Sequence, residues 1–149
     1  MHWRIVWALA SALAAGQTAA CSYIVQTQLS FEGDSADLHR SQVIKLAEWL
    51  NRSYATFPKY KRAAVETGAS GPVPSEAKAL AEQRAANTVR ALRMLLRTDL
   101  PVETYSQAYR SPVSPFEESN DFASLHLYPD MKDLNLPSCS RTSESGIKR

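Results

Sequence analysis

Hydrophobic and polar positions alternate near the start of the chain, and a helical period then replaces the alternation. In residues 24–31 every second side chain is apolar or β-branched, which predicts a half-buried β-strand. A Gly33-Asp34-Ser35 turn follows. From about residue 41 to residue 57, apolar residues recur at helical spacing, which predicts an amphipathic helix packed on another element. The apolar stripe of this helix consists of Val43, Leu46, Ala47, Leu50, Tyr54 and Phe57.

A second strand and helix follow. A short strand is expected over 63–67, and the glycines and prolines of 68–74 predict a loop. Ser75 is expected to cap a helix that runs to about Arg97 and ends before Pro101. The inward-facing residues of that helix are expected to be Ala77, Leu80, Ala81, Ala85, Thr88, Leu92 and Leu95.

Two further strands, over 102–109 and 122–128, complete the order strand, helix, strand, helix, strand, strand. Because two helices can cover one face of a small mixed sheet, the predicted fold is an α/β two-layer sandwich. Tyr105 and Tyr109 alternate along their strand, so they either pack under a helix or form an aromatic binding face on a bare side of the sheet.

The first 20 residues differ from the rest. His2 and Arg4 precede an apolar run, and small residues end the segment at Ala20, which is the pattern of a secretory signal peptide. The apolar run is shorter than the ~20 residues that a membrane-spanning helix needs. We therefore expect an exported protein with a signal peptide over 1–20, one domain over 21–139 and a Ser-rich, disordered tail over 140–149.

The only two cysteines, Cys21 and Cys139, leave two alternatives open. Cys21 follows small residues, as the lipidated cysteine of a bacterial lipoprotein does, and lipidation would anchor the protein to the outer membrane. Thr18, however, stands where such a motif usually has an aliphatic residue. In the favoured alternative, Cys21 and Cys139 form a disulfide in an oxidising compartment.

Charge and composition exclude several functions. The chain has 17 Lys and Arg and 15 Asp and Glu among its 149 residues, and a formal net charge of +2. This near balance argues against a nucleic-acid partner, which usually requires a clustered basic stripe. Arg90, Arg93 and Arg97 lie at helical spacing, and they are interpreted as a solvated helix face in preference to a site for an acidic partner or lipid headgroups.

Signals for catalysis are weak. The chain has no nucleophile elbow, zinc-protease helix motif or phosphate-binding glycine loop, so no catalytic residue, metal site or cofactor is expected. His39 and His126 are interpreted as surface residues. The acidic residues of 117–121 are interpreted as a solvated loop in preference to a weak cation site.

Three stretches resemble the OmpA-like domain family. The segment 80–85, Leu-Ala-Glu-Gln-Arg-Ala, followed by Val89 and Leu92, is similar to the second helix of these domains. Residues 31–50 are similar to their first strand, turn and helix, and residues 102–115 to their third strand and loop. The resemblance covers residues 24–129 and implies a non-catalytic envelope domain that binds peptidoglycan.

The resemblance also implies where the ligand residues should be, and this chain departs from that pattern. OmpA-like domains hold the diaminopimelate carboxylates of peptidoglycan with an Asp after strand two and an Arg in an Asn-Arg-Arg run before strand four. The Asp position falls on Ala69, and no Arg lies between Ser111 and Tyr128. In this fold strand four pairs beside strand one, which would bring Cys139 within reach of Cys21.

These observations predict a periplasmic cell-envelope protein with a binding or scaffold role, whose ligand is now a protein. One alternative is peptidoglycan binding through other residues, with Arg84 or Arg110 supplying the positive charge. Another is a periplasmic inhibitor or immunity-type protein that fills an enzyme cleft with residues 111–121. A membrane contact is expected only if Cys21 is lipidated.

Overall fold

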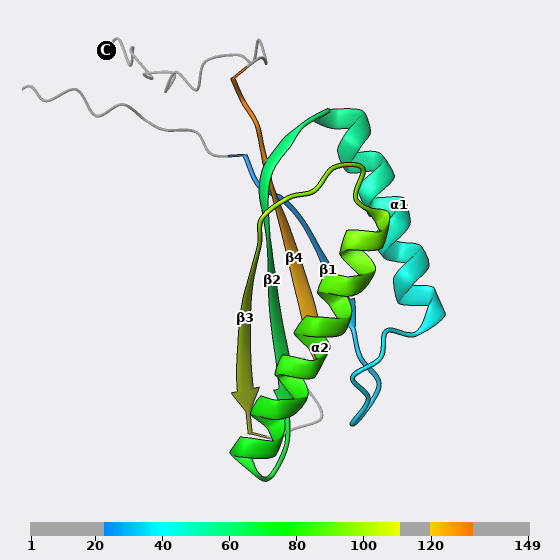
Figure 1. Cartoon of the computed structure of the whole chain (residues 1–149). Helices are drawn as coiled ribbons and strands as arrows, with labels where there is room; N and C mark the ends of the chain where they lie inside the picture. The colour runs from blue at the N-terminus through cyan, green and yellow to red at the C-terminus, as the bar shows by residue number, and fades with distance from the viewer. Residues whose placement is uncertain (1–22, 111–119, 133–149) are drawn as a thin grey trace, which may run out of the picture. The chain divides into compact units, whose positions relative to one another are not determined.

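The computed structural model describes residues 23–110 and 120–132, and its elements follow the predicted order (Figure 1). The elements are β1 (Val25–Ser30), α1 (Arg40–Thr56), β2 (Tyr60–Ser70), α2 (Pro74–Leu95), β3 (Val102–Tyr109) and β4 (Phe122–Pro129).

The four strands form one mixed sheet in the order β1-β4-β2-β3. β4 lies between β1 and β2 and is antiparallel to both, whereas β2 and β3 are parallel. A parallel pair needs a long crossover connection, and α2 provides it. In the register of the sheet, Ala64 of β2 is opposite His126 of β4, and Glu66 of β2 is opposite Tyr105 of β3.

Both helices cover the same face of the sheet (Figure 1). The core between the two layers includes side chains with no exposed surface, such as Leu29, Leu46, Leu92 and Leu127. The predicted α/β two-layer sandwich is therefore confirmed.

The opposite face of the sheet is covered by no helix among the described residues. We call it the open face. Strand β4 shows the difference between the faces, because its buried residues alternate with half-buried ones along its length. The open-face residues of the three strands β2, β3 and β4 are Arg62, Ala64, Glu66, Gly68, Glu103, Tyr105, Gln107, Tyr109, Phe122, Ser124, His126 and Tyr128.

An aromatic cluster at the end of α1 explains why β2 begins earlier than the sequence indicates. The Tyr54 and Tyr60 rings meet edge to face at 5.4 Å, and the Tyr60 hydroxyl donates to the Ser53 carbonyl at 2.7 Å. Burial of the Tyr60 phenol raises its pKa. Tyr60 is thereby held in the core, and the strand starts there and not at residue 63.

The structure corrects two details of the predicted elements. β2 extends to Ser70, so Gly68 lies in a strand and not in the predicted loop. Ser75 does not cap α2, because Val73 is the N-cap residue and Pro74 occupies the first turn. Proline suits that position, since its fixed φ matches a helix and it lacks an N–H that would need a partner.

Candidate functional site

The side chain with the most concentrated polar chemistry in the described residues is Arg84 of α2. It lies on the buried face of the helix between Ala81 and Thr88, and none of its surface is exposed. Small side chains on this face leave room for the long arginine side chain to run toward the end of the sheet. A fully buried guanidinium requires partners, because an unpaired buried charge is strongly unfavourable.

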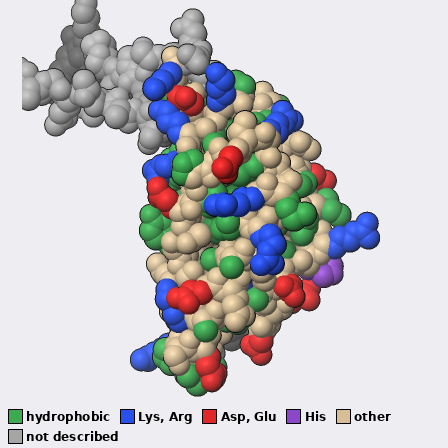
Figure 2. All heavy atoms as spheres, viewed as in Figure 1, with side chains coloured by type: hydrophobic (Ala, Val, Ile, Leu, Met, Phe, Trp, Pro, Cys, Tyr) green, Lys and Arg blue, Asp and Glu red, His purple; other side chains and the backbone are tan. Residues whose placement is uncertain are grey.

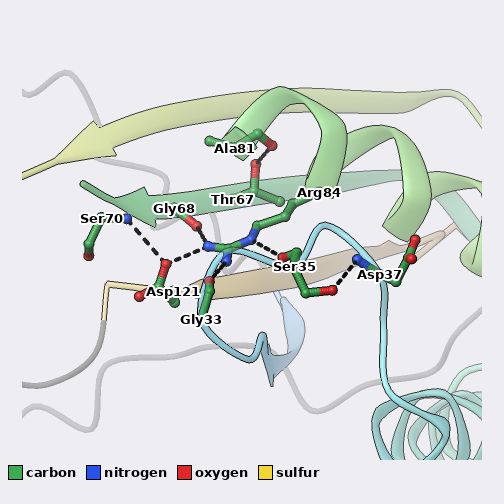
Figure 3. Close-up of polar contacts among 9 residues, drawn as sticks. All are labelled: Gly33, Ser35, Asp37, Thr67, Gly68, Ser70, Ala81, Arg84 and Asp121. Atoms are coloured by element: carbon green, nitrogen blue, oxygen red, sulfur yellow. Dashed lines mark hydrogen bonds and ion pairs between the residues drawn. The ribbon is translucent and has the colours of Figure 1, made fainter. Parts of the chain in front are cut away.

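The guanidinium of Arg84 donates to four oxygens from three separate segments (Figure 3). Nε donates to the Ser35 carbonyl at 2.9 Å, and Nη1 donates to the Gly68 carbonyl at 3.0 Å. Nη2 donates to the Gly33 carbonyl, and Nη1 also pairs with a carboxylate oxygen of Asp121. Arg84 thus joins α2 to the turn after β1, the end of β2 and the residue before β4.

Asp121 supplies the negative charge of this cluster. Its side chain is 21% exposed, and its Oδ1 also accepts the backbone N–H of Ser70 at 3.2 Å. The backbone carbonyl of Asp121 accepts the N–H of Phe31, whose ring lies 4.7 Å from the Arg84 guanidinium. The carboxylate therefore balances the arginine charge at the boundary between core and solvent.

Two glycines permit this arrangement. Gly33 has a φ of +47°, a left-handed conformation that most other residues adopt only with strain. At Gly68, a Cβ atom would lie 2.7 Å from Phe122 Cε1 and 2.9 Å from Tyr109 Cε2, and it would also overlap the Asn120 carbonyl oxygen. Glycine therefore allows the chain before β4 to pass close enough for Asp121 to reach Arg84.

The structure makes neither Arg110 nor Ala69 a side-chain partner of Arg84, although Ala69 lies between two residues of the cluster, Gly68 and Ser70. Arg110 is exposed at the end of β3, whereas Ala69 is fully buried in β2. Cys21, Cys139 and residues 111–119 lie outside the described residues. Of the acidic segment 117–121, the structure describes residues 120 and 121. Asp121 forms an ion pair with Arg84, so the prediction that it belongs to a solvated loop was wrong.

Sequence reasoning named Arg84 but missed its partner. The helical period places residue 84 inside the inward stripe of α2, and a charged residue in such a stripe requires a counter-charge. Asp121, which immediately precedes a strand, was an available candidate.

Arg90 and Arg93 are exposed on α2, in agreement with a solvated face, whereas the exposed Arg97 lies beyond Leu95, where the helix ends before the predicted residue. Lys and Arg side chains are mixed with Asp and Glu on the helix side of the molecule (Figure 2). His39 is the N-cap residue of α1, and its side chain accepts the backbone N–H of Ser41.

Within residues 23–110 and 120–132, no helix is long and apolar enough to cross a membrane. No group of His, Cys, Asp or Glu side chains in the same residues is arranged to hold a metal ion.

The sheet order and the helix layer define an OmpA-like fold, as the resemblance implied. The OmpA-like domain of FopA1 from Francisella tularensis matches this chain with a TM-score of 0.53 at 14% identity, over 73% of this chain and 79% of that domain. The periplasmic domain of MotB from Helicobacter pylori matches with a TM-score of 0.50 at 16% identity, over 75% of this chain and 79% of that one. No family model and no curated protein matches the sequence.

Proposed function

We propose that this chain is an exported cell-envelope protein that acts in the periplasm as a non-catalytic binding or scaffold module. Two observations support this role. Residues 1–20 have the pattern of a secretory signal peptide, and the fold is shared with a domain of MotB that is described as periplasmic. We further propose that its ligand is a protein of the envelope and not peptidoglycan.

The Arg84–Asp121 pair carries the proposal that peptidoglycan is no longer the ligand. A site for the carboxylates of a peptide needs a guanidinium that can offer two N–H groups to solvent. Arg84 has no exposed surface, and its donors are directed at Asp121 and at three main-chain carbonyls. Ala69, at the position that the resemblance assigns to the ligand Asp, is also fully buried.

Peptidoglycan binding through other residues is the second candidate, and the exposure of Arg110 favours it. Arg110 can approach a ligand without any rearrangement. Arg84 can do so only if Asp121 first moves away from the guanidinium, which would expose a charge that the fold now buries.

Co-sedimentation with isolated peptidoglycan sacculi distinguishes the two candidates. The mature exported protein is mixed with sacculi at low and at moderate salt, and the pellet is assayed for protein. We expect the protein to remain in the supernatant at moderate salt, since residual charge attraction is screened within about 10 Å at 0.1 M ionic strength.

Salt-resistant pelleting would contradict the proposal and support the second candidate. In that case Arg110→Gln should abolish pelleting, while Arg93→Gln, which removes the same charge from an exposed position on α2, should not. If the protein stays in the supernatant, affinity capture from the periplasm follows. A captured hydrolase that the protein inhibits would indicate an inhibitor or immunity-type protein.

A further inference from the structure

The open face contains a small hollow between β2, β3 and β4. Its volume is about 130 Å³, and it is lined by Ala64, Glu66, Tyr105, His126 and Tyr128. Ligand pockets for whole small molecules usually measure about 300–1,000 Å³. This hollow therefore fits one terminal group of a ligand and not a complete cofactor.

The walls of the hollow are aromatic, and the sheet register explains why they meet there. Tyr105 is directly opposite Glu66 across the β2–β3 pair, and His126 is opposite Ala64 across the β2–β4 pair. Side chains directly opposite each other in a sheet are neighbours on the same face. Ala64 contributes only a methyl group, so the rings of Tyr105, His126 and Tyr128 surround a depression in the surface.

Glu66 gives the hollow a negative charge. Among the residues that the structure describes, its carboxylate has no hydrogen bond or ion-pair partner, although the side chain is only partly exposed. The nearby cation, Arg62, is paired with Glu103 at 2.9 Å, so it does not cancel the charge of Glu66. The charged side chains of Arg62, Glu66 and Glu103 thus have a formal net charge of about −1 at this site.

The rings themselves favour a positive group. The guanidinium of Arg62 lies 3.8 Å from the centre of the Tyr128 ring and occupies one face of it, so Tyr128 offers a ligand only its other face and its edge. Tyr105 is held in place because its hydroxyl donates to Glu103 at 3.2 Å. This hydrogen bond, with the charge of Glu103, raises the pKa of the Tyr105 phenol.

We propose that the hollow binds an alkylammonium group, with Glu66 as the counter-charge and Tyr105 and Tyr128 as the aromatic walls. Aromatic rings beside a carboxylate attract cations through the ring quadrupole and through charge, and quaternary ammonium groups are typical ligands of such sites. The proposal goes beyond the proposed envelope role, and it concerns the face of the sheet opposite the Arg84 cluster.

Choline is the probe that tests the proposal, with cadaverine as a primary ammonium and 3,3-dimethylbutan-1-ol as the neutral analogue of choline. Each is titrated into the isotope-labelled mature protein at about pH 8, where an ordinary imidazole is uncharged. We expect saturable amide shifts at Ala64, Glu66, Tyr105 and His126 with choline, and none with the neutral alcohol. A stronger response to cadaverine would identify a primary ammonium as the ligand group.

Glu66→Gln tests the charge with little change in shape. It should weaken choline binding about tenfold, which corresponds to about 1.4 kcal/mol. Glu76→Gln is the matched control, because it removes the same charge from an exposed position on α2 and should leave the affinity unchanged. Tyr105→Leu should weaken binding several-fold, and circular dichroism establishes that each variant is folded.

Three results would overturn the proposal. One is equal binding of choline and its neutral analogue, and another is equal loss of affinity in Glu66→Gln and Glu76→Gln. The third is the absence of saturable shifts with either amine in the folded wild-type protein. In this last case, a response to glucose would assign the face to a neutral saccharide, and concentration-dependent self-association would assign it to a second copy of the chain. Co-sedimentation with sacculi is a separate measurement, so either proposal can fail without the other.

Discussion

Replacement of Asp121 by alanine is the perturbation that best tests how the Arg84 cluster is held together. Arg84 has no exposed surface, so the variant leaves a buried guanidinium with only main-chain carbonyls as partners. Loss of one partner of a buried ion pair costs about 3–5 kcal/mol. Asp121 is 21% exposed, so water can partly replace it, and we expect a cost near 3 kcal/mol.

Two further variants separate charge from hydrogen bonding. Asp121→Asn keeps an acceptor for Arg84 and for the Ser70 N–H, so it should cost only about 1–1.5 kcal/mol, the difference between charged and neutral hydrogen bonds. Arg84→Met should also cost about 3 kcal/mol, because three carbonyls lose their donor and Asp121 loses its ion pair with Arg84. The double variant Arg84→Met with Asp121→Ala should cost about 1–3 kcal/mol less than the sum of the single variants.

The assay is urea unfolding followed by the fluorescence of Trp49. This residue is 6% exposed and is the only tryptophan after residue 20, so its emission reports the core in a chain from which residues 1–20 have been removed. Formate offers an independent check, since a small carboxylate should raise the stability of Asp121→Ala and not that of the double variant. Strictly additive costs, or a cost below about 1 kcal/mol for Asp121→Ala, would refute the reasoning.

Three further predictions concern other parts of the chain. Gly68→Ala should destabilise the fold by about 1–3 kcal/mol in urea unfolding, because the added Cβ would overlap β4 and the Asn120 carbonyl. Gly71→Ala is the control. Its Cβ would meet its nearest neighbour at 3.5 Å, so this variant should be neutral or slightly stabilising. The pKa of Tyr60 is raised in the folded protein, so the protonated phenol contributes its full stabilisation below pH ~10, and this stabilisation is lost as the pH rises through the folded-state pKa. Unfolding curves of Tyr60→Phe should therefore show a smaller loss of stability at alkaline pH than those of the wild type. Intact mass of the exported protein should be lower than the fully reduced chain by two hydrogens if Cys21 and Cys139 form the proposed disulfide, whereas a mass increased by acyl chains would establish lipidation.

The order of elements was predictable because each amphipathic pattern reports which side of an element is buried. The first and last residues of β2 could not be predicted from the sequence. Lys61 and Arg62 resemble a polar break between elements, yet Arg62 lies on the open face, where an ion pair with Glu103 satisfies its charge. Gly68 resembles a loop residue, yet it lies in a strand because a neighbouring segment passes directly over it. Both residues are explained only by chain segments that are distant in sequence.

The candidate site shows the same limit. The helical period alone places Arg84 on a buried face, so its need for a counter-charge can be inferred from the sequence. The identity of that counter-charge cannot, since Asp121 lies 37 residues away and is brought to Arg84 by the position of β4 in the sheet. The hollow beside Glu66 was equally hidden, because its walls come from three strands whose register is a tertiary property.

The place of β4 in the sheet has a consequence for how the protein is made. A chain that is synthesised from its N-terminus presents β1, α1, β2, α2 and β3 first, but within the described residues β1 pairs only with β4. Until residues 122–129 emerge, β1 has no strand partner and Arg84 lacks its carboxylate. β4 therefore completes the sheet, and the pairings that it makes are among the last that a chain emerging from its N-terminus can form.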